Sequence, residues 1–137
     1  MTLEELYYFH AFLNYKLFKG ELEPVAIRFF DDNNSQDGTI ATILTETDPF
    51  IICMDKSLLE GDPVFTITIL LHEMIHQYNR QREEEDIDEY TGEHNEIFKQ
   101  AAEKKGMITG GYGLTAETKN LIEEQLKLFS WATALHI

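Results

Sequence analysis

LLHEMIHQY at residues 70–78 is the stretch around which the rest of this chain can be interpreted. It contains His72, Glu73 and His76 in an HExxH spacing. Residues four apart lie above one another on a helix, so both imidazoles could reach one zinc ion at the ~2.0–2.1 Å of a Zn–N bond. Glu73 would project about 100° around the helix from His72, where a general base acting on a metal-activated water should lie. The pattern therefore predicts two metal ligands and a catalytic base.

The same stretch belongs to a predicted amphipathic helix. Apolar residues recur at the helical period on the face opposite the polar trio, namely Ile67, Leu70, Leu71, Met74, Ile75 and Tyr78. Asp62 followed by Pro63 is a start signal, because aspartate caps helix N-termini and proline is favoured at the first helical position. Residues 66–69 read TITI and would also fit a strand, but the stripe and the cap favour a helix. The alternative interpretation is a surface helix with incidental histidines.

A catalytic zinc usually takes three protein ligands and a water, so a third ligand must come from elsewhere in the chain. His94 is the strongest candidate, because apolar residues at positions 97, 98 and 101 share its helical face. This second helix would follow Thr91-Gly92 and end at Lys104-Lys105-Gly106. Glu93 and Glu96 compete as the third ligand. The alternative for His94 is a partly exposed position at the start of the helix.

Residues 80–90, between the two helices, are rich in acidic residues and are predicted to form a solvated loop. Their run Glu83–Asp86 would favour basic substrates if it lay near a cleft. The extended zinc motif of the metzincins needs glycine at position 79 and histidine at position 82. This chain has Asn79 and Arg82, so that class is excluded.

The rest of the chain predicts an α+β fold. We expect a helix over residues 2–18, a small antiparallel sheet with strands over 25–30, 39–45 and 50–54, a turn over 31–38, and a final helix over 115–134. His10 is expected at the edge of the core. Tyr112 lies in the glycine-rich segment 107–113 and is expected to be an ordinary loop aromatic. Its alternative role is a hydrogen bond to a developing oxyanion.

The chain resembles the SprT-like metalloprotease domains, the family that includes the protease core of Spartan. The segments that carry the resemblance are Leu13-Asn14, Phe18, Gly20, Leu22, IICMDKSLL at 51–59, LLHEMIHQY at 70–78 and EHNEIF at 93–98. They fall within about residues 3–105, and the segment around His72 is the most specific of them.

The resemblance implies a zincin-like fold: an N-terminal helix, a small antiparallel sheet, two helices that carry the zinc site, and a C-terminal helix. It also implies His72, His76 and His94 as ligands of one Zn²⁺ per chain, with Glu73 as the catalytic base. Family members usually have glycine after the third histidine, where this chain has Asn95. We expect Asn95 inside a helix, where the change should do little harm.

Composition bounds the class of protein. The 137 residues, 43% of them hydrophobic, are expected to form one domain over residues 1–137. Cys53 is the one cysteine, so we expect no internal disulfide and no paired-cysteine zinc ribbon of the kind many SprT-like proteins append. The first residues lack the pattern of a secretion signal, and no stretch approaches the ~20 apolar residues of a membrane span. We therefore expect a cytoplasmic protein without membrane contact.

Charge argues against nucleic acid as a partner. The chain has 11 Lys and Arg against 25 Asp and Glu, a net charge of −14. Such a field repels phosphate and opposes the counterion release that drives binding to DNA. The resemblance to Spartan, which acts on proteins crosslinked to DNA, therefore does not lead us to expect DNA binding by this domain alone.

The sequence predicts a zinc-dependent metallopeptidase that acts on protein or peptide substrates. One alternative is a zinc-binding regulatory module without turnover, but Glu73 argues against it, because a structural zinc site needs no base and usually has a fourth protein ligand. Another alternative is a cytosolic HExxH protease that cleaves a repressor, a class that usually has a glutamate as third ligand. Separate substitutions of His94 and Glu96 would discriminate between these enzymes.

Overall fold

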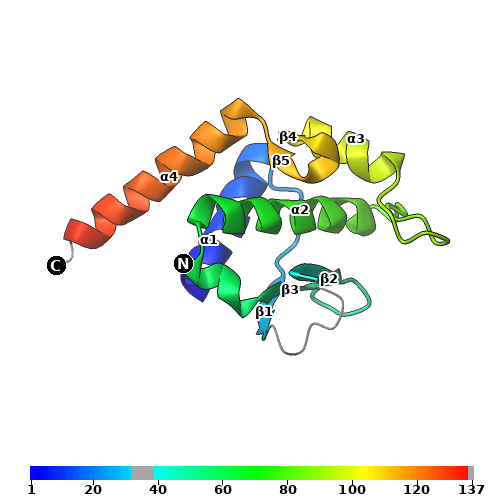
Figure 1. The fold of residues 1–137 in the computed structure, drawn as a ribbon, viewed down its shortest axis with the longest axis horizontal. Coiled ribbons are helices and arrows are strands. Elements are labelled where there is room, and N and C mark those ends of the chain that lie inside the picture. Colours follow the sequence, from blue (N-terminus) through cyan, green and yellow to red (C-terminus); the bar gives the residue numbers. More distant parts are fainter. Residues whose placement is uncertain (32–38, 136–137) are drawn as a thin grey trace.

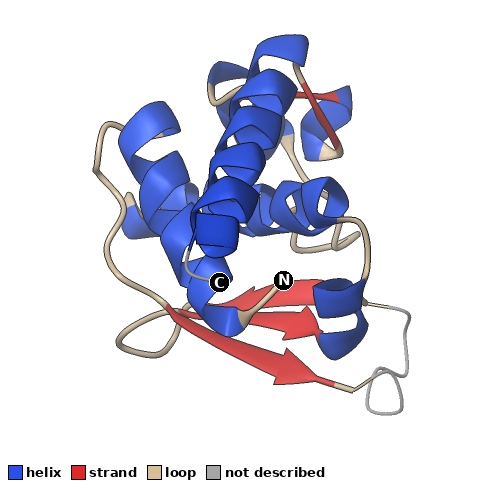
Figure 2. Ribbon diagram, turned by 90° about the vertical axis from the view of Figure 1, so that its left-hand side faces the viewer, coloured by secondary structure: helices blue, strands red, loops and turns tan. Residues whose placement is uncertain are grey.

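The computed structural model describes residues 1–31 and 39–135, and for residues 130–135 it describes the backbone alone. Within these residues a three-stranded sheet is covered on one face by helices (Figure 2). The elements are α1 (Leu3–Leu17), β1 (Ala26–Phe30), β2 (Ala41–Leu44), β3 (Ile51–Asp55), η2 (Lys56–Glu60), α2 (Pro63–Gln81), α3 (Glu96–Lys104), β4 (Met107–Ile108), η3 (Thr109–Gly111), β5 (Gly113–Leu114) and α4 (Ala116–Leu135). The predicted α+β class is confirmed. The predicted turn at 31–38, apart from Asp31, lies outside the described residues.

Helix α1 begins with a capping box. The hydroxyl of Thr2 accepts from the backbone N–H of Glu5, and the Glu5 carboxylate accepts from the backbone N–H of Thr2. Three apolar residues of the helix, Leu6, Phe9 and Leu13, are fully buried. His10 is also buried, and its Nε2 lies 2.8 Å from the side-chain oxygen of Gln77 on α2. His10 therefore ties α1 to α2 at the edge of the core, as expected.

The three-stranded sheet is mixed, so the prediction of an antiparallel sheet is wrong for one of its two pairings. The strand order is β1-β3-β2; β2 pairs antiparallel with β3, whereas β1 pairs parallel with β3. The last strand in sequence thus lies in the centre. Its residues 51–54 read IICM, a continuous apolar run in which Ile52 and Met54 are buried and Ile51 and Cys53 are half-buried. The order of the strands along the chain is therefore not their order in the sheet.

Helix α2 lies at the centre of the molecule (Figure 1). Asp62 caps it by accepting from the backbone N–H of Val64 at 3.0 Å, and Pro63 is its first residue. The predicted core stripe is buried from Ile67 to Ile75, and Tyr78 is half-buried. Within the TITI segment, the hydroxyls of Thr66 and Thr68 donate to carbonyls one turn back, which satisfies them inside a helix. The helical interpretation of this segment is confirmed.

Helix α3 begins later than its periodicity predicts. His94 lies outside the helix, and Asn95 is its N-cap, with Oδ1 accepting from the backbone N–H of Phe98 at 3.2 Å. We expected Asn95 inside the helix, and this expectation is wrong. Asn95 is the N-cap, a position at which asparagine is among the preferred residues. The reason is that a cap supplies hydrogen bonds to the first turn, which the apolar periodicity cannot reveal.

The C-terminal part returns to the core through a short hairpin. Strands β4 and β5 pair antiparallel around η3, and α4 follows. Phe129 of α4 packs edge-on against Tyr8 of α1 with ring centroids 4.5 Å apart, while the end of α4 projects from the molecule (Figure 1). Among the described residues, no helix combines the length and hydropathy needed to cross a bilayer.

Candidate metal centre

Three histidines converge on one point of the surface. His72, His76 and His94 each offer one ring nitrogen, and these nitrogens all lie within 4.8 Å of one another. The ring centroids are 5.2 Å apart for His72 and His76, and 5.0 Å apart for each of these with His94. Nitrogens that share one tetrahedral zinc at ~2.0–2.1 Å lie about 3.3 Å apart. Small side-chain adjustments would thus let all three bind one ion.

His94 reaches the other two histidines from a loop. It forms an isolated antiparallel bridge with Ile87, and flanking backbone hydrogen bonds run from Asp88 to Glu93 at 2.7 Å and from Asn95 to Asp86 at 3.1 Å. The inward helical face that predicted His94 as a ligand is therefore not what positions it. Instead, backbone hydrogen bonds between residues 86–88 and residues 93–95 of the α2–α3 loop position His94.

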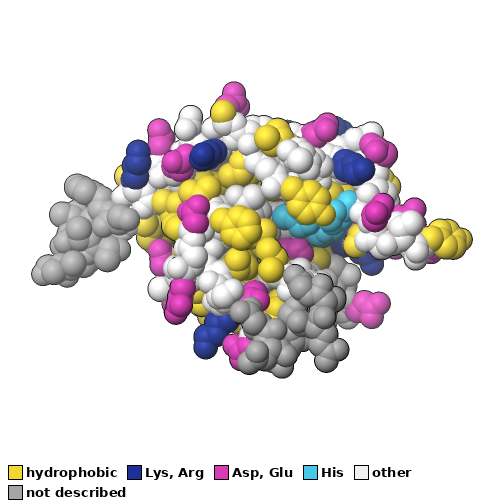
Figure 3. Space-filling view, viewed as in Figure 1, with side chains coloured by type: hydrophobic (Ala, Val, Ile, Leu, Met, Phe, Trp, Pro, Cys, Tyr) yellow, Lys and Arg dark blue, Asp and Glu magenta, His cyan; other side chains and the backbone are white. Residues whose placement is uncertain are grey.

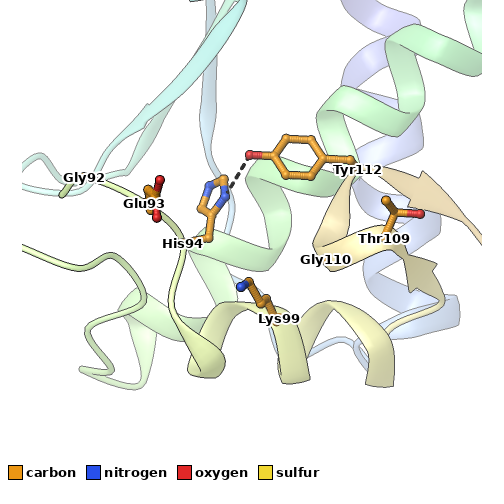
Figure 4. Close-up of a pocket in the computed structure, with 7 residues that line it drawn as sticks. All are labelled: Gly92, Glu93, His94, Lys99, Thr109, Gly110 and Tyr112. Carbon is orange, nitrogen blue, oxygen red and sulfur yellow. Dashed lines mark hydrogen bonds between the residues drawn. The ribbon is translucent and has the colours of Figure 1, made fainter.

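Each of the three rings has its Nδ1 occupied by a protein group. His72 Nδ1 lies 2.6 Å from the carbonyl oxygen of Gly111, and His76 Nδ1 lies 2.7 Å from Oδ2 of Asp86. A carbonyl or a carboxylate accepts but does not donate, so both Nδ1 atoms carry the proton. His94 Nδ1 lies 2.9 Å from the hydroxyl of Tyr112 (Figure 4). This arrangement leaves the Nε2 lone pairs of His72 and His76 free for a metal.

Burial keeps two of these imidazoles neutral. Desolvation lowers the pKa of His72 to about 4, although its hydrogen bond to Gly111 acts in the opposite direction. Desolvation also lowers the pKa of His94, with the neighbouring His76 adding to the effect. Neutral imidazole is the form that binds metals, so both rings are ready to do so at neutral pH.

Phe98 of α3 forms an apolar floor beneath the three rings. Its centroid lies 4.9 Å from that of His72, 4.4 Å from that of His76 and 4.2 Å from that of His94. Gly111 must be a glycine in this arrangement: its φ is +96°, and a Cβ there would lie 2.5 Å from the Phe98 ring. The missing side chain lets the Gly111 carbonyl approach His72.

Asp86 is a site residue that the sequence did not reveal. The prediction of a solvated loop holds for Glu83 to Glu85, which are exposed, but Asp86 is buried. Burial by itself would raise the pKa of Asp86, but hydrogen bonds from His76 and Asn79 outweigh it and hold that pKa below its usual value. A metal-ligating histidine usually donates its second ring N–H to an acceptor such as a carboxylate. The sequence has four acidic residues in a row at 83–86 and does not show which of them accepts this hydrogen bond.

Glu73 is buried beside the histidines. It is 4% exposed, and desolvation raises its pKa to about 7, with the charge of Asp86 acting in the same direction and that of His76 against it. A carboxyl group with this pKa can take up and release a proton near neutral pH, as general acid–base catalysis requires.

The structure thus brings together His72, His76 and His94, and Glu73 lines cavities with His76 and with His72. The competing ligands Glu93 and Glu96 are exposed, and neither belongs to the cluster of possible metal ligands found among residues 1–31 and 39–135. Comparisons of the chain with models of known protein families, with curated proteins and with solved structures found no match.

Proposed function

We propose that this chain is a zinc-dependent metallopeptidase of the SprT-like type. The observation that carries the proposal is the convergence of His72, His76 and His94 with every Nδ1 already hydrogen-bonded. This donor set fits zinc, which imidazole nitrogen suits well. Three protein ligands with an open fourth position are typical of catalytic zinc sites, whereas structural sites usually have four protein ligands.

The residues of the chain divide the chemistry between them. Zinc held by the three histidines would act as a Lewis acid and lower the pKa of a bound water. The carboxylate of Glu73 takes the proton of the attacking water and then donates it to the leaving amine, a shuttle that its pKa near 7 supports. The hydrogen bonds from His72 to Gly111 and from His76 to Asp86 keep the two rings from rotating.

The position of β2 in the sheet supports a peptide as substrate. Among the described residues, β2 is an edge strand in the order β1-β3-β2. A cavity of about 140 Å³ is lined by Thr42 and Thr45, which belong to this edge and its end, together with Glu73 and His76. An extended peptide that added to this edge would bring its backbone alongside the catalytic carboxylate.

The two alternatives have less support. A repressor-cleaving protease with a glutamate as third ligand would need Glu93 or Glu96 at the centre, but both are exposed outside it. A regulatory module without turnover would gain nothing from Glu73. Burying a carboxyl group until its pKa reaches about 7 disfavours the charged form and lowers stability at neutral pH.

Hydrolysis of a labelled unfolded protein by the zinc-loaded chain tests the proposal. Glu73→Gln should keep its zinc and lose about 10²–10⁴-fold in kcat, because the amide replaces the base without changing the packing. Glu96→Gln, a matched change at an exposed glutamate outside the ligand cluster, should retain activity. Equal rates for wild type and Glu73→Gln, at equal zinc content by elemental analysis, would reject the role of Glu73. A zinc-loaded wild type without turnover would instead favour the regulatory module.

A further inference from the structure

A cavity of about 250 Å³ opens directly beside the candidate centre, between α2, the start of β2 and the segment after η3. Two of its lining residues, His72 and Glu73, belong to the centre itself. Much of the remaining wall is apolar or aromatic and includes Ile40, Phe65, Ile69 and Tyr112. None of the described residues that line it is Lys or Arg. The cavity therefore adjoins the reacting groups but offers no cationic side chain to an anionic ligand.

The apolar wall and a metal ligand share one face of α2. Phe65, Ile69 and His72 follow the spacing i, i+4, i+7, which lies opposite the stripe that packs into the core. Phe65 is 49% exposed, so it contributes little to the core. Figure 3 shows hydrophobic side chains directly beside the exposed histidines on this face of the molecule. Phe65 thus lies beside the centre without packing into the core, whereas Ile69 is partly buried against the core.

A second cavity that contains Glu73 is different in character. It is smaller, about 140 Å³, and its walls are mixed: Thr42, Thr45, Arg80 and Asp86 are polar or charged, whereas Ile43 and Ile87 are apolar. A peptide bound at the centre would therefore have two unlike cavities beside the carboxyl group of Glu73, one mainly apolar and one mixed with a cation and a carboxylate in its wall. This asymmetry gives the site a means of distinguishing the residues on the two sides of a cleaved bond.

We infer that the cavity lined by Phe65 and Ile69 is a specificity pocket that accepts one large apolar side chain, such as that of leucine or phenylalanine, next to the cleaved bond. The inference rests on the proposed peptidase function and names its substrate class. At about 250 Å³ the cavity is smaller than the ~300–1,000 Å³ of pockets that hold a drug-sized ligand, but it has room for a single side chain. A negatively charged side chain placed there would lose its hydration and meet no Lys or Arg among the described lining residues.

Two series of probes with one varied side chain test the inference on the zinc-loaded chain. The first consists of fluorescence-quenched peptides that carry Leu, Phe, Ala, Asp or Lys beside the cleaved bond. The second consists of dipeptide hydroxamates with the same side chains, whose affinities are measured by calorimetry and require no turnover. Leu and Phe should exceed Ala by about 10- to 100-fold in kcat/KM and in affinity, and Asp should be poorest.

Variants locate the preference within the cavity. Phe65→Ala should reduce the advantage of Leu over Ala about tenfold, and Phe65→Arg should shift the preference toward Asp, because it puts a cation in the wall. Leu128→Ala is the matched control: Leu128 is 57% exposed on α4 and does not line the cavity. It should leave the ranking of side chains unchanged.

The outcomes separate this inference from the proposed function. Ranked hydroxamate affinities that respond to Phe65, in a chain that cleaves none of the peptides, would keep the pocket and reject the peptidase. Cleavage without side-chain preference would keep the peptidase and reject the pocket. Equal or undetectable affinity for all hydroxamates, or an equal response to Leu128→Ala, would also overturn the pocket.

Discussion

Asp86 accepts a hydrogen bond from Nδ1 of His76 at 2.7 Å, and both side chains are buried. Asp86 also accepts from the side-chain amide of Asn79 at 3.1 Å, so the loop after α2 is tied back to that helix at two positions. The contact fixes the His76 tautomer with the proton on Nδ1. Asp86 thus links the orientation of His76, a candidate metal ligand, to the conformation of the loop that carries His94.

Asp86→Asn should therefore weaken zinc binding by about 10–100-fold, the range typical of lost partners of ligating histidines. The amide keeps the size of the side chain but removes its charge. Glu85→Gln is the matched control, because Glu85 is exposed and pairs with Arg80 at 2.8 Å, outside the ligand cluster. Competition with a chromogenic chelator measures both affinities. Equal values for Asp86→Asn and Glu85→Gln would contradict the role given to Asp86.

His94→Ala should lose most bound zinc, whereas Glu96→Ala should keep one zinc per chain. The reason is that His94 belongs to the ligand cluster and Glu96 is exposed outside it. Elemental analysis after dialysis against a weak chelator gives the zinc content directly. Full occupancy in His94→Ala combined with loss in Glu96→Ala would show that the ligand set is wrong.

Gly111→Ala should be destabilised more than Gly92→Ala, by at least about 1 kcal/mol in the free energy of unfolding. Both glycines have positive φ, +96° and +74°, so both variants bear the strain of a left-handed backbone. A Cβ at Gly111 would lie 2.5 Å from the Phe98 ring, whereas nothing lies within 4 Å of one at Gly92. Urea denaturation of the two variants compares them. Equal decreases in the free energy of unfolding would contradict the prediction, because they would mean that the Phe98 ring moves aside at no cost in stability.

Glu73 should make a contribution to the stability of the zinc-free chain that falls as pH rises. Its pKa is about 7 in the folded chain against an ordinary 4.5, so unfolding releases a proton between these values. The stabilisation is complete below about pH 4.5 and is lost as pH rises through about 7. The difference between the folded and ordinary pKa values corresponds to about 3 kcal/mol in the free energy of unfolding. Glutamine has no charge to bury, so Glu73→Gln removes this pH dependence. The variant should therefore be more stable than wild type at pH 8, and its advantage should shrink toward pH 4.

Chelator-treated wild type and Glu73→Gln can be compared by urea denaturation across this range. The histidines with lowered pKa values are common to both proteins, so their contribution cancels in the difference. A difference between the two proteins that stays constant from pH 4 to pH 8 would contradict the raised pKa of Glu73.

The chain should bind duplex DNA weakly or not at all at physiological salt. Its net charge of −14 leaves few cations to neutralise phosphates, which supply most of the affinity of non-specific binding. Fluorescence anisotropy with a labelled duplex measures this. A dissociation constant below about 10⁻⁶ M would show that local clusters of Lys and Arg outweigh the net charge.

The sequence by itself determined α2 and what lies along it. Hydrophobic periodicity and caps act within a few residues, so Asp62 could be recognised as the start of the helix and Ile67 as part of its buried face. The i, i+4 spacing of His72 and His76 is likewise a local property of a helix. These features need no information about the rest of the chain.

Only the tertiary structure decided the surroundings of that pair. His94 is positioned by a β-bridge across a loop, Asp86 is singled out from its acidic neighbours by burial, and the Gly111 carbonyl arrives from 39 residues further along the chain. Loops have no period from which their contacts can be read, and their conformation follows from backbone hydrogen bonds and close packing with distant elements. The central place of β3 was decided in the same way, because it depends on pairing with β1, whose partner residues lie about 25 positions earlier in the chain.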